Sequence, residues 1–244
     1  MRNPLIGLFV AVLLVFTSCK DNDPLKPRTL SKRLKAEVVL MVKAKNEKPV
    51  YAANFYMYCS MAMKQGKVTN PDNTSELSMK KGDEKGMRCV RIAEDGDYTT
   101  KLPQLGKYQF QANVTKKNIT IKNIDELYGD KLGLIKPKAI AVNKDKLNVT
   151  WDLLKDADAY RIKLFSSEGK LLFRSPVLKN KDKVFAFNKH SRGWMAVEKA
   201  TKGKKYKMEL SAIRFEKAFK TKSDRGFNVQ CISFCEKEIT WELN

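Results

Sequence analysis

Cysteine and histidine are the side chains of this sequence best suited to nucleophilic or metal chemistry. The 244 residues contain five cysteines and one histidine. Structural zinc needs four Cys or His ligands in closely spaced pairs, and no C-x-x-C pair is present. His190 lies in a polar run, residues 188–192, and no Ser-His-Asp or Cys-His arrangement can be assembled around it. We therefore predict a solvated loop position for His190, no catalytic residue, no metal site and no cofactor.

Four of the cysteines fall in the body of the sequence, where they could form disulfides. Cys59 and Cys89 could bond to each other in an oxidising compartment, or both could be buried free thiols. Cys231 and Cys235 fall on one predicted strand, where four residues span about 13 Å. A disulfide needs Cα atoms within about 7 Å, so these two should not bond unless a turn breaks the strand.

The acidic residues offer little catalytic or metal-binding chemistry. Asp and Glu occur mainly beside lysines in predicted turns, which favour these residue types in any case. Glu94, Asp95 and Asp97 could cradle Ca²⁺, but the spacing of an EF-hand is absent. No glycine-rich phosphate loop follows a predicted strand, and no basic-aromatic platform suits single-stranded nucleic acid. The sequence therefore predicts neither an enzyme nor a nucleic-acid binder.

The start of the chain has the pattern of a secretory signal peptide. Arg2 precedes an apolar run over residues 4–16, and small polar residues follow. A run of about 13 residues is too short to cross a hydrocarbon core, which needs about 20. A positive residue, a short apolar run and a small-residue end are typical of a cleaved signal. We predict a signal peptide over residues 1–18.

The end of this segment resembles the bacterial lipobox, in which an apolar residue and two small residues precede a cysteine. The matching residues here are Phe16, Thr17, Ser18 and Cys19; the family usually has Leu where Phe16 stands. The resemblance implies that the Cys19 thiol takes a diacylglyceryl group and becomes the new amino terminus. Two or more acyl chains hold a protein stably at a membrane. The alternative is an ordinary cleaved signal that ends by chance at a cysteine.

Residues 19–33 read as a flexible tether between this cysteine and the folded body. They are polar and contain Pro24 and Pro27. The residues just after the cysteine, 20–23, resemble a short Lys-plus-acidic signal that directs some lipoproteins to the outer face of the outer membrane. The resemblance implies an outer-membrane lipoprotein that is exposed at the cell surface; the alternative is a plain acidic tether.

Period-two alternation of apolar and polar residues predicts β-strands through the next hundred residues. The alternating stretches cover residues 34–44, 51–63, 87–92, 108–114 and 119–124, with a polar stretch over 65–86. In the first strand Leu34 through Ala44 form one face at alternate positions. The other face carries Lys35, Glu37, Lys43 and Lys45. Short strands at this spacing predict an immunoglobulin-like antiparallel β-sandwich over residues 34–135.

A second strand pattern begins near Lys136-Pro137. Alternating residues cover 147–151, 160–164, 171–173, 206–212 and 229–235, the last extending toward residue 241. Trp151, followed by Ala157 to Ile162 with Tyr160 among them, resembles the second and third strands of a fibronectin type III domain. Gly203 to Tyr206 resembles that family's tyrosine corner, without its usual proline. The resemblance implies a second sandwich over residues 136–244, with Trp151 and Tyr160 as core residues and a Tyr206 hydroxyl bonded to nearby backbone.

The net charge of the whole chain bears on which partners it could bind. Lys and Arg number 48 against 27 Asp and Glu, a formal net charge of +21. This excess is either a solvated surface or a face that binds anions. We predict an all-β, non-catalytic, membrane-anchored lipoprotein of the cell envelope that acts as an interaction or structural module. The alternative function is a basic binding module for an anionic glycan or lipopolysaccharide; the partner protein or glycan stays unknown.

Overall fold

The computed structural model describes residues 34–115, 119–143, 145–195, 199–216 and 228–243. The signal peptide, Cys19 and the tether therefore lie outside the described residues. Residues 32–244 form one unit by their contacts. The division into modules at residue 136 stays a prediction.

The described chain is almost entirely β-structure, so the predicted all-β class is confirmed. The first half contains β1 Lys35–Lys45, β2 Lys48–Tyr58, β3 Met63–Thr69, β4 Glu76–Lys81, β5 Arg88–Arg91, the 3-10 turn η1 Asp95–Asp97, β6 Gly106–Val114 and β7 Ile119–Leu127. The second half contains β8 Pro137–Asn143, β9 Lys146–Trp151, β10 Ala159–Phe165, β11 Leu171–Arg174, β12 Leu178–Lys179, β13 Val184–Phe187, β14 Lys205–Phe215 and β15 Val229–Thr240.

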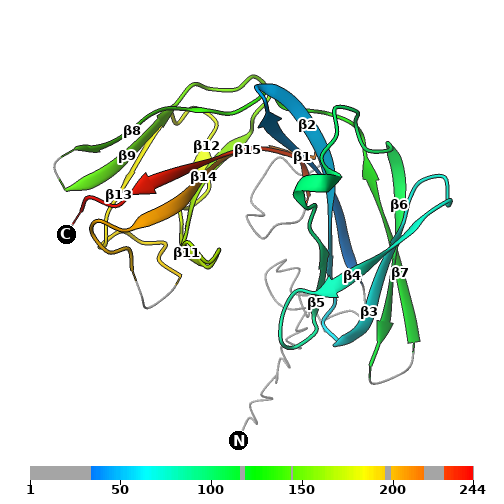
Figure 1. Cartoon of the computed structure of the whole chain (residues 1–244). Helices are drawn as coiled ribbons and strands as arrows, with labels where there is room; N and C mark the ends of the chain where they lie inside the picture. The colour runs from blue at the N-terminus through cyan, green and yellow to red at the C-terminus, as the bar shows by residue number, and fades with distance from the viewer. Residues whose placement is uncertain (1–33, 116–118, 144, 196–198, 217–227, 244) are drawn as a thin grey trace, which may run out of the picture. The chain divides into compact units, whose positions relative to one another are not determined.

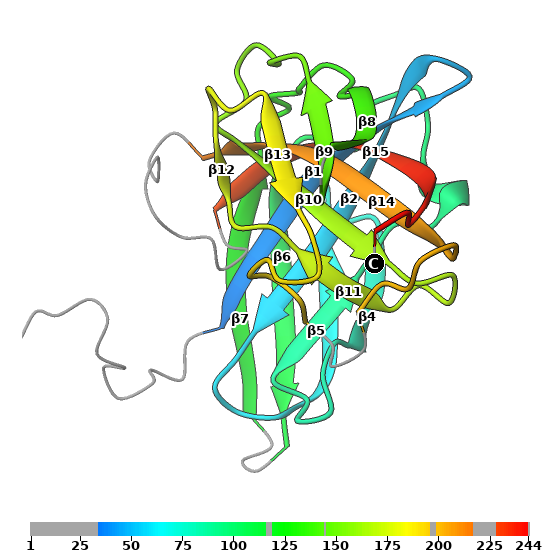
Figure 2. The ribbon, with the colours of Figure 1, turned by 90° about the vertical axis from the view of Figure 1, so that its left-hand side faces the viewer.

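The described strands form one large sheet and one small sheet. The large sheet has the order β11-β10-β14-β15-β1-β2-β5-β4-β3-β6-β7, and β12 also pairs with β10. The small sheet has the order β13-β9-β8, which can be followed in Figure 2. β15 lies between β14 and β1 (Figure 1) and pairs with β1 in parallel over Leu40 to Val42. The large sheet is therefore mixed, whereas the sequence predicted purely antiparallel pairing.

Two strand boundaries differ from the sequence prediction. The single strand expected over residues 51–63 is two strands, because β2 ends at Tyr58 and β3 begins at Met63. The chain leaves β2 where the Cys59 N–H donates to the Met87 carbonyl. The polar stretch over 65–86, where the sequence indicated no strand, contains most of β3 and all of β4. Alternation is weak there because Met79 is the single buried residue of β4.

Three short strands had no clear sequence pattern. β8 follows Lys136 directly, and β12 and β13 lie in the long polar stretch between Val177 and Ala200. β8 is mostly exposed, and β12 and β13 each bury a single residue, Leu178 and Phe187. A strand with few buried positions shows no strong alternation, because burial on one face is what produces it. The strands expected from alternation in this half are all present, and β15 reaches Thr240.

Both faces of β1 are buried, which corrects the half-buried strand that we expected. Val38, Leu40 and Val42 pack in the larger apolar core. Val39 and Met41 pack in a second core with residues of β2, β10, β14 and β15. The second core forms because the pairing with β15 brings these strands beside β1.

The charged residues of this second face of β1 differ in their exposure. Glu37, expected at the surface, is only 1% exposed. Lys35 and Lys45 are exposed as expected, and Lys43 is partly covered.

Candidate functional site

The three aromatic residues singled out by the fibronectin type III resemblance all lie in the core. Trp151 and Tyr160 are buried, and their ring centroids lie 5.4 Å apart. The Tyr160 hydroxyl accepts a hydrogen bond from the backbone N–H of Leu154 at 2.8 Å. Tyr206, at the start of β14, accepts one from the N–H of Thr201 at 2.8 Å. Each tyrosine thus holds a neighbouring loop against its strand.

The described cysteines are free thiols. The disulfide considered between Cys59 and Cys89 is absent, and both residues are buried. Register explains this: Cys89 lies opposite Met57, so Cys59 is its diagonal neighbour. Diagonal neighbours in a sheet are about 7–8 Å apart, beyond easy disulfide reach. Cys231 and Cys235 lie on the continuous strand β15 and are also free.

The acidic turn that could have cradled calcium is instead paired with basic side chains. Asp95 bonds to Lys43, and Asp97 lies 3.1 Å from Arg91. The Lys43 pairing lowers the pKa of Asp95 by hydrogen bonding and by charge. Among the described residues no group of three His, Cys, Asp or Glu side chains could hold a metal ion. His190 is exposed in a loop.

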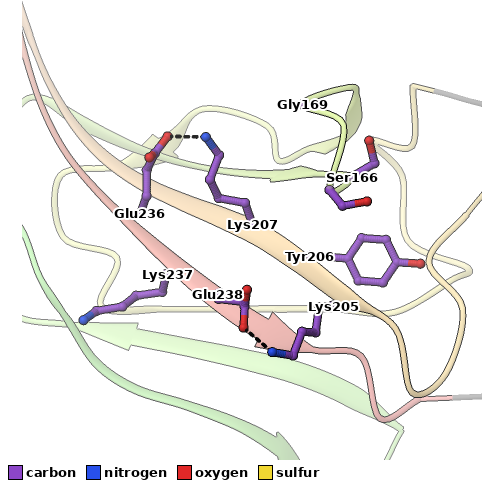
Figure 3. A pocket seen from close by; sticks show the side chains of 9 residues that line it. Ser166, Gly169, Lys205, Tyr206, Lys207, Glu236, Lys237 and Glu238 are labelled. Carbon is purple, nitrogen blue, oxygen red and sulfur yellow. Dashed lines mark ion pairs between the residues drawn. The ribbon is translucent and has the colours of Figure 1, made fainter. Parts of the chain in front are cut away.

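A shallow cavity of about 360 Å³ opens where the β10–β11 turn meets β14 and β15 (Figure 3). Its lining combines ammonium groups, carboxylates and hydroxyls. The lining residues are Ser166, Ser167, Gly169, Lys205, Tyr206, Lys207, Glu236, Lys237 and Glu238. We call it the β14–β15 pocket. Of these residues, only Tyr206 was predicted from the sequence as a site residue.

Strand register positions the charged groups of the β14–β15 pocket. β14 and β15 are antiparallel, with Lys207 opposite Glu238. Residues two apart share a face of a strand, so Lys205 and Lys207 point the same way, as do Glu236 and Glu238. The ion pairs run diagonally across the two strands, Lys205 to Glu238 at 2.8 Å and Lys207 to Glu236 at 3.0 Å (Figure 3).

A tight turn builds the opposite wall of the pocket. Ser166 N–H donates to the Lys170 carbonyl, and Gly169 N–H donates to the Ser166 carbonyl. Gly169 has φ of +79°, a backbone conformation that favours glycine because it lacks a Cβ. The Ser166 hydroxyl accepts the Lys170 N–H at 3.1 Å, which orients it in the turn.

The charged groups of the pocket partly neutralise one another. Hydrogen bonding and the charge of Glu238 raise the pKa of Lys205, which keeps this lysine cationic. The side chains of both pairs are more than 40% exposed, so solvent screens them strongly. Lys237 has no ion-pair partner within 4 Å among the described residues. Three lysines against two glutamates leave the lining with a small positive excess.

The lining lacks the partners that nucleophilic catalysis requires. No residue that lines the pocket is a histidine or a cysteine, and its serines have no activating base. Both carboxylates are engaged by lysines. The arrangement can contact a polar or charged ligand through hydroxyls and ammonium groups. Alternating Lys and Glu at positions 205–209 and 236–238 was a signal that sequence reasoning could have used, once the two strands were known to pair.

Freeing the pocket lysines should strengthen binding of polyanions. We expect the double substitution Glu236→Gln, Glu238→Gln to raise the affinity for an acidic polysaccharide such as polygalacturonate by about threefold to tenfold, because two lysines lose their internal partners. Lys205→Gln with Lys207→Gln, the matched double variant, should lower the affinity. Titration at two salt concentrations measures both. Equal affinities for all three proteins would show that this pocket does not contact the polymer.

Comparisons with known proteins do not assign a family. No protein-family model and no curated protein matches the chain. Among solved structures, the FN1-FN3 domains of chicken CNTN1 match over 84% of this chain at 10% identity, with a TM-score of 0.29. The BSP domain of a biofilm associated protein matches over 86% at 9% identity, with a TM-score of 0.27. The chain spans 66% and 52% of the lengths of these two proteins.

Proposed function

We propose that this chain is a non-catalytic interaction module that acyl chains on Cys19 hold at a membrane of the cell envelope. The observation that carries the non-catalytic part is the lining of the β14–β15 pocket. Its carboxylates and two of its lysines neutralise one another, and it offers hydroxyls without an activating base. Such a surface can hold a ligand but has no group poised to attack or to transfer a proton.

The anchoring part of the proposal rests on the sequence alone. A short apolar run ends at Phe16 and is followed by Thr17, Ser18 and Cys19, and this order supports lipid attachment to the cysteine. Among the described residues, no helix has the length and apolar character needed to span a bilayer. The outer membrane is the proposed location, on the resemblance of residues 20–23 to a surface-export signal.

Palmitate labelling tests the anchor directly. Cells that express the full chain and are fed radiolabelled palmitate should incorporate label into it, and the protein should sediment with membranes. Cys19→Ala should abolish the label. The variant protein should either be released from the membrane or be retained with its signal peptide uncut. Cys235→Ala is the matched control, because this thiol lies in the folded body and its loss should leave labelling unchanged. Equal labelling of the Cys19→Ala variant would exclude lipid attachment at this position.

A second candidate function is binding of an anionic glycan or lipopolysaccharide. The supporting observation is the excess of 21 positive charges over the whole chain, together with Lys237 at the pocket. Such binding should weaken steeply with added salt, because exposed charges are screened over about 10 Å at 0.1 M ionic strength. An interaction insensitive to salt would favour a protein partner over a glycan.

A further inference from the structure

The two outer strands of the large sheet, β11 and β7, each lie against another segment of the described chain. The edge of β11 bonds to the segment after it: the Arg174 N–H donates to the Gly193 carbonyl, and the Met195 N–H donates to the Leu172 carbonyl. Uncovered edges are templates on which another strand can pair, so covering them prevents unwanted association.

β1 lies against part of the edge of β7. The Asp125 side chain accepts the Val38 N–H at 2.7 Å, and the Asn123 side chain donates to the Leu34 carbonyl at 2.8 Å. These side chains take up backbone groups of β1 that face β7.

β8 leaves one edge uncovered. Within the described ranges it pairs with β9 alone, as the outer strand of the small sheet (Figure 2). Its sequence over Ala139 to Val142 is entirely apolar, yet these residues are largely exposed, Val142 by 42%. β13, at the other edge of this sheet, has only four residues, and short edge strands are poor templates.

The hydrogen-bonding direction along β9 shows which backbone groups of β8 face outward. The Trp151 N–H donates to the Lys183 carbonyl, so Trp151 bonds toward the β13 side. Backbone groups alternate in direction along a strand, so Thr150 and Asn148 bond toward β8. Their partners in β8 are Ala139 and Ala141. The N–H and C=O groups of Ile140 and Val142 therefore point away from β9, toward the uncovered edge.

The surroundings of this edge carry positive charge. Lys136 and Lys138 flank its start, and Lys146 follows the turn at its end. Lys138 lies 3.8 Å from Asp152, but both side chains are at least 70% exposed, so this pair is weak. An extended strand that docked here would therefore meet an apolar centre flanked by ammonium groups.

We propose that β8 binds an extended, acidic segment of a partner protein, which adds to the small sheet as a fourth strand. Main-chain hydrogen bonds from Ile140 and Val142 supply the pairing, and the flanking lysines select carboxylates. A second copy of this chain is the poorer occupant. If two β8 strands paired antiparallel around Ile140, Lys136 and Lys138 of one copy would lie toward the end of β8 that Lys146 follows in the other copy, and like charges would repel. Pro137 and the adjacent irregularity restrict pairing to the residues after them.

A proline substitution on the outward-facing side tests the edge without breaking the sheet. Val142→Pro removes an N–H that points away from β9, and proline is tolerated on that side of an edge strand. Val142→Thr is the matched control, because it keeps the N–H and the β-branched shape. The probe is a labelled, end-blocked heptapeptide of alternating valine and glutamate, with a valine–lysine heptapeptide as the charge control.

We expect the glutamate peptide to bind the parent protein and the Val142→Thr variant equally. Binding to Val142→Pro should fall by about tenfold or more, through loss of a main-chain hydrogen bond and a clash with the ring. The lysine peptide should bind at least tenfold more weakly than the glutamate peptide. Amide hydrogen exchange at Ile140 and Val142 should slow when the glutamate peptide binds, because these N–H groups then have acceptors.

Three results would overturn the inference: peptide binding unchanged by Val142→Pro, equal binding of the two peptides, or self-association of the parent protein that this variant abolishes. The last would mean that a second copy occupies the edge. The inference adds a partner class and a surface to the proposed function. It is independent of lipid attachment, since all of these measurements can be made on the Cys19→Ala variant of the full chain.

Discussion

Glu37→Gln should stabilise the fold by on the order of 3 kcal/mol at pH 7 and flatten the dependence of stability on pH. Glu37 lies on β1, beside β15, and is only 1% exposed. One carboxyl oxygen accepts the Val229 N–H, and the other has no partner among the described residues. Burial raises the pKa of Glu37 to about 9, and the carboxylates of Asp125 and Glu216 add to the rise, against the Val229 hydrogen bond.

The sign of the pH dependence follows from this pKa. The folded state holds the Glu37 proton up to about pH 9, whereas the unfolded chain releases it near the ordinary glutamate pKa of 4.5. The folded state therefore binds more protons across this window, and stability falls as pH rises through it, by up to about 1.4 kcal/mol per pH unit. Glutamine keeps an oxygen for Val229 and removes the titration.

Urea denaturation at half-unit steps from pH 5 to pH 9 measures this effect. The parent protein should lose stability with rising pH, and Glu37→Gln should lose less. Glu242→Gln, at an exposed position, is the matched control for removal of one negative charge and should follow the parent curve. Burial also raises the pKa values of Asp125 and Glu216, so a residual slope should remain in Glu37→Gln. Parallel curves for the parent and Glu37→Gln would contradict the prediction.

Gly193→Ala should destabilise the fold by about 3 kcal/mol or more. Gly193 has φ of +122°, and a Cβ there would collide with the carbonyl oxygen of Arg174 and approach the Phe173 ring to 2.9 Å. The Gly193 carbonyl also accepts the Arg174 N–H at 2.9 Å, so backbone movement would break the cover of β11. Backbone strain adds to the steric overlap, and neither neighbour is the flexible end of a side chain.

Gly169→Ala separates the cost of backbone strain at positive φ from the cost of steric overlap at Gly193. Gly169 also has positive φ, at +79°, but a Cβ there would meet nothing within 4 Å. It should cost about 1 kcal/mol, the strain alone. The difference between the midpoints of urea denaturation for the two variants isolates the collision with the strand. Equal losses of stability in the two variants would contradict the prediction, because they would mean that the backbone at Gly193 moves to accommodate the Cβ at no cost in free energy.

Individual elements show what alternation could and could not predict. β6, β9 and β10 each bury one face against a core, and the sequence prediction placed all three. β4, β8 and β12 bury little, so they carried no pattern to detect. The β14–β15 pocket was missed for another reason. Its lysines and glutamates are ordinary surface residues until the register of two strands sets Lys205 beside Glu238.

The local order of apolar and polar residues by itself determined that this chain is all-β, because burial of alternate side chains on one face requires that order. The chain order also carries the whole basis for proposing lipid at Cys19. Only the tertiary structure decided that β1 is buried on both faces and that Glu37 is enclosed. The Val229 N–H that meets Glu37 is 192 residues away along the chain, and no local pattern specifies which distant strands will pair.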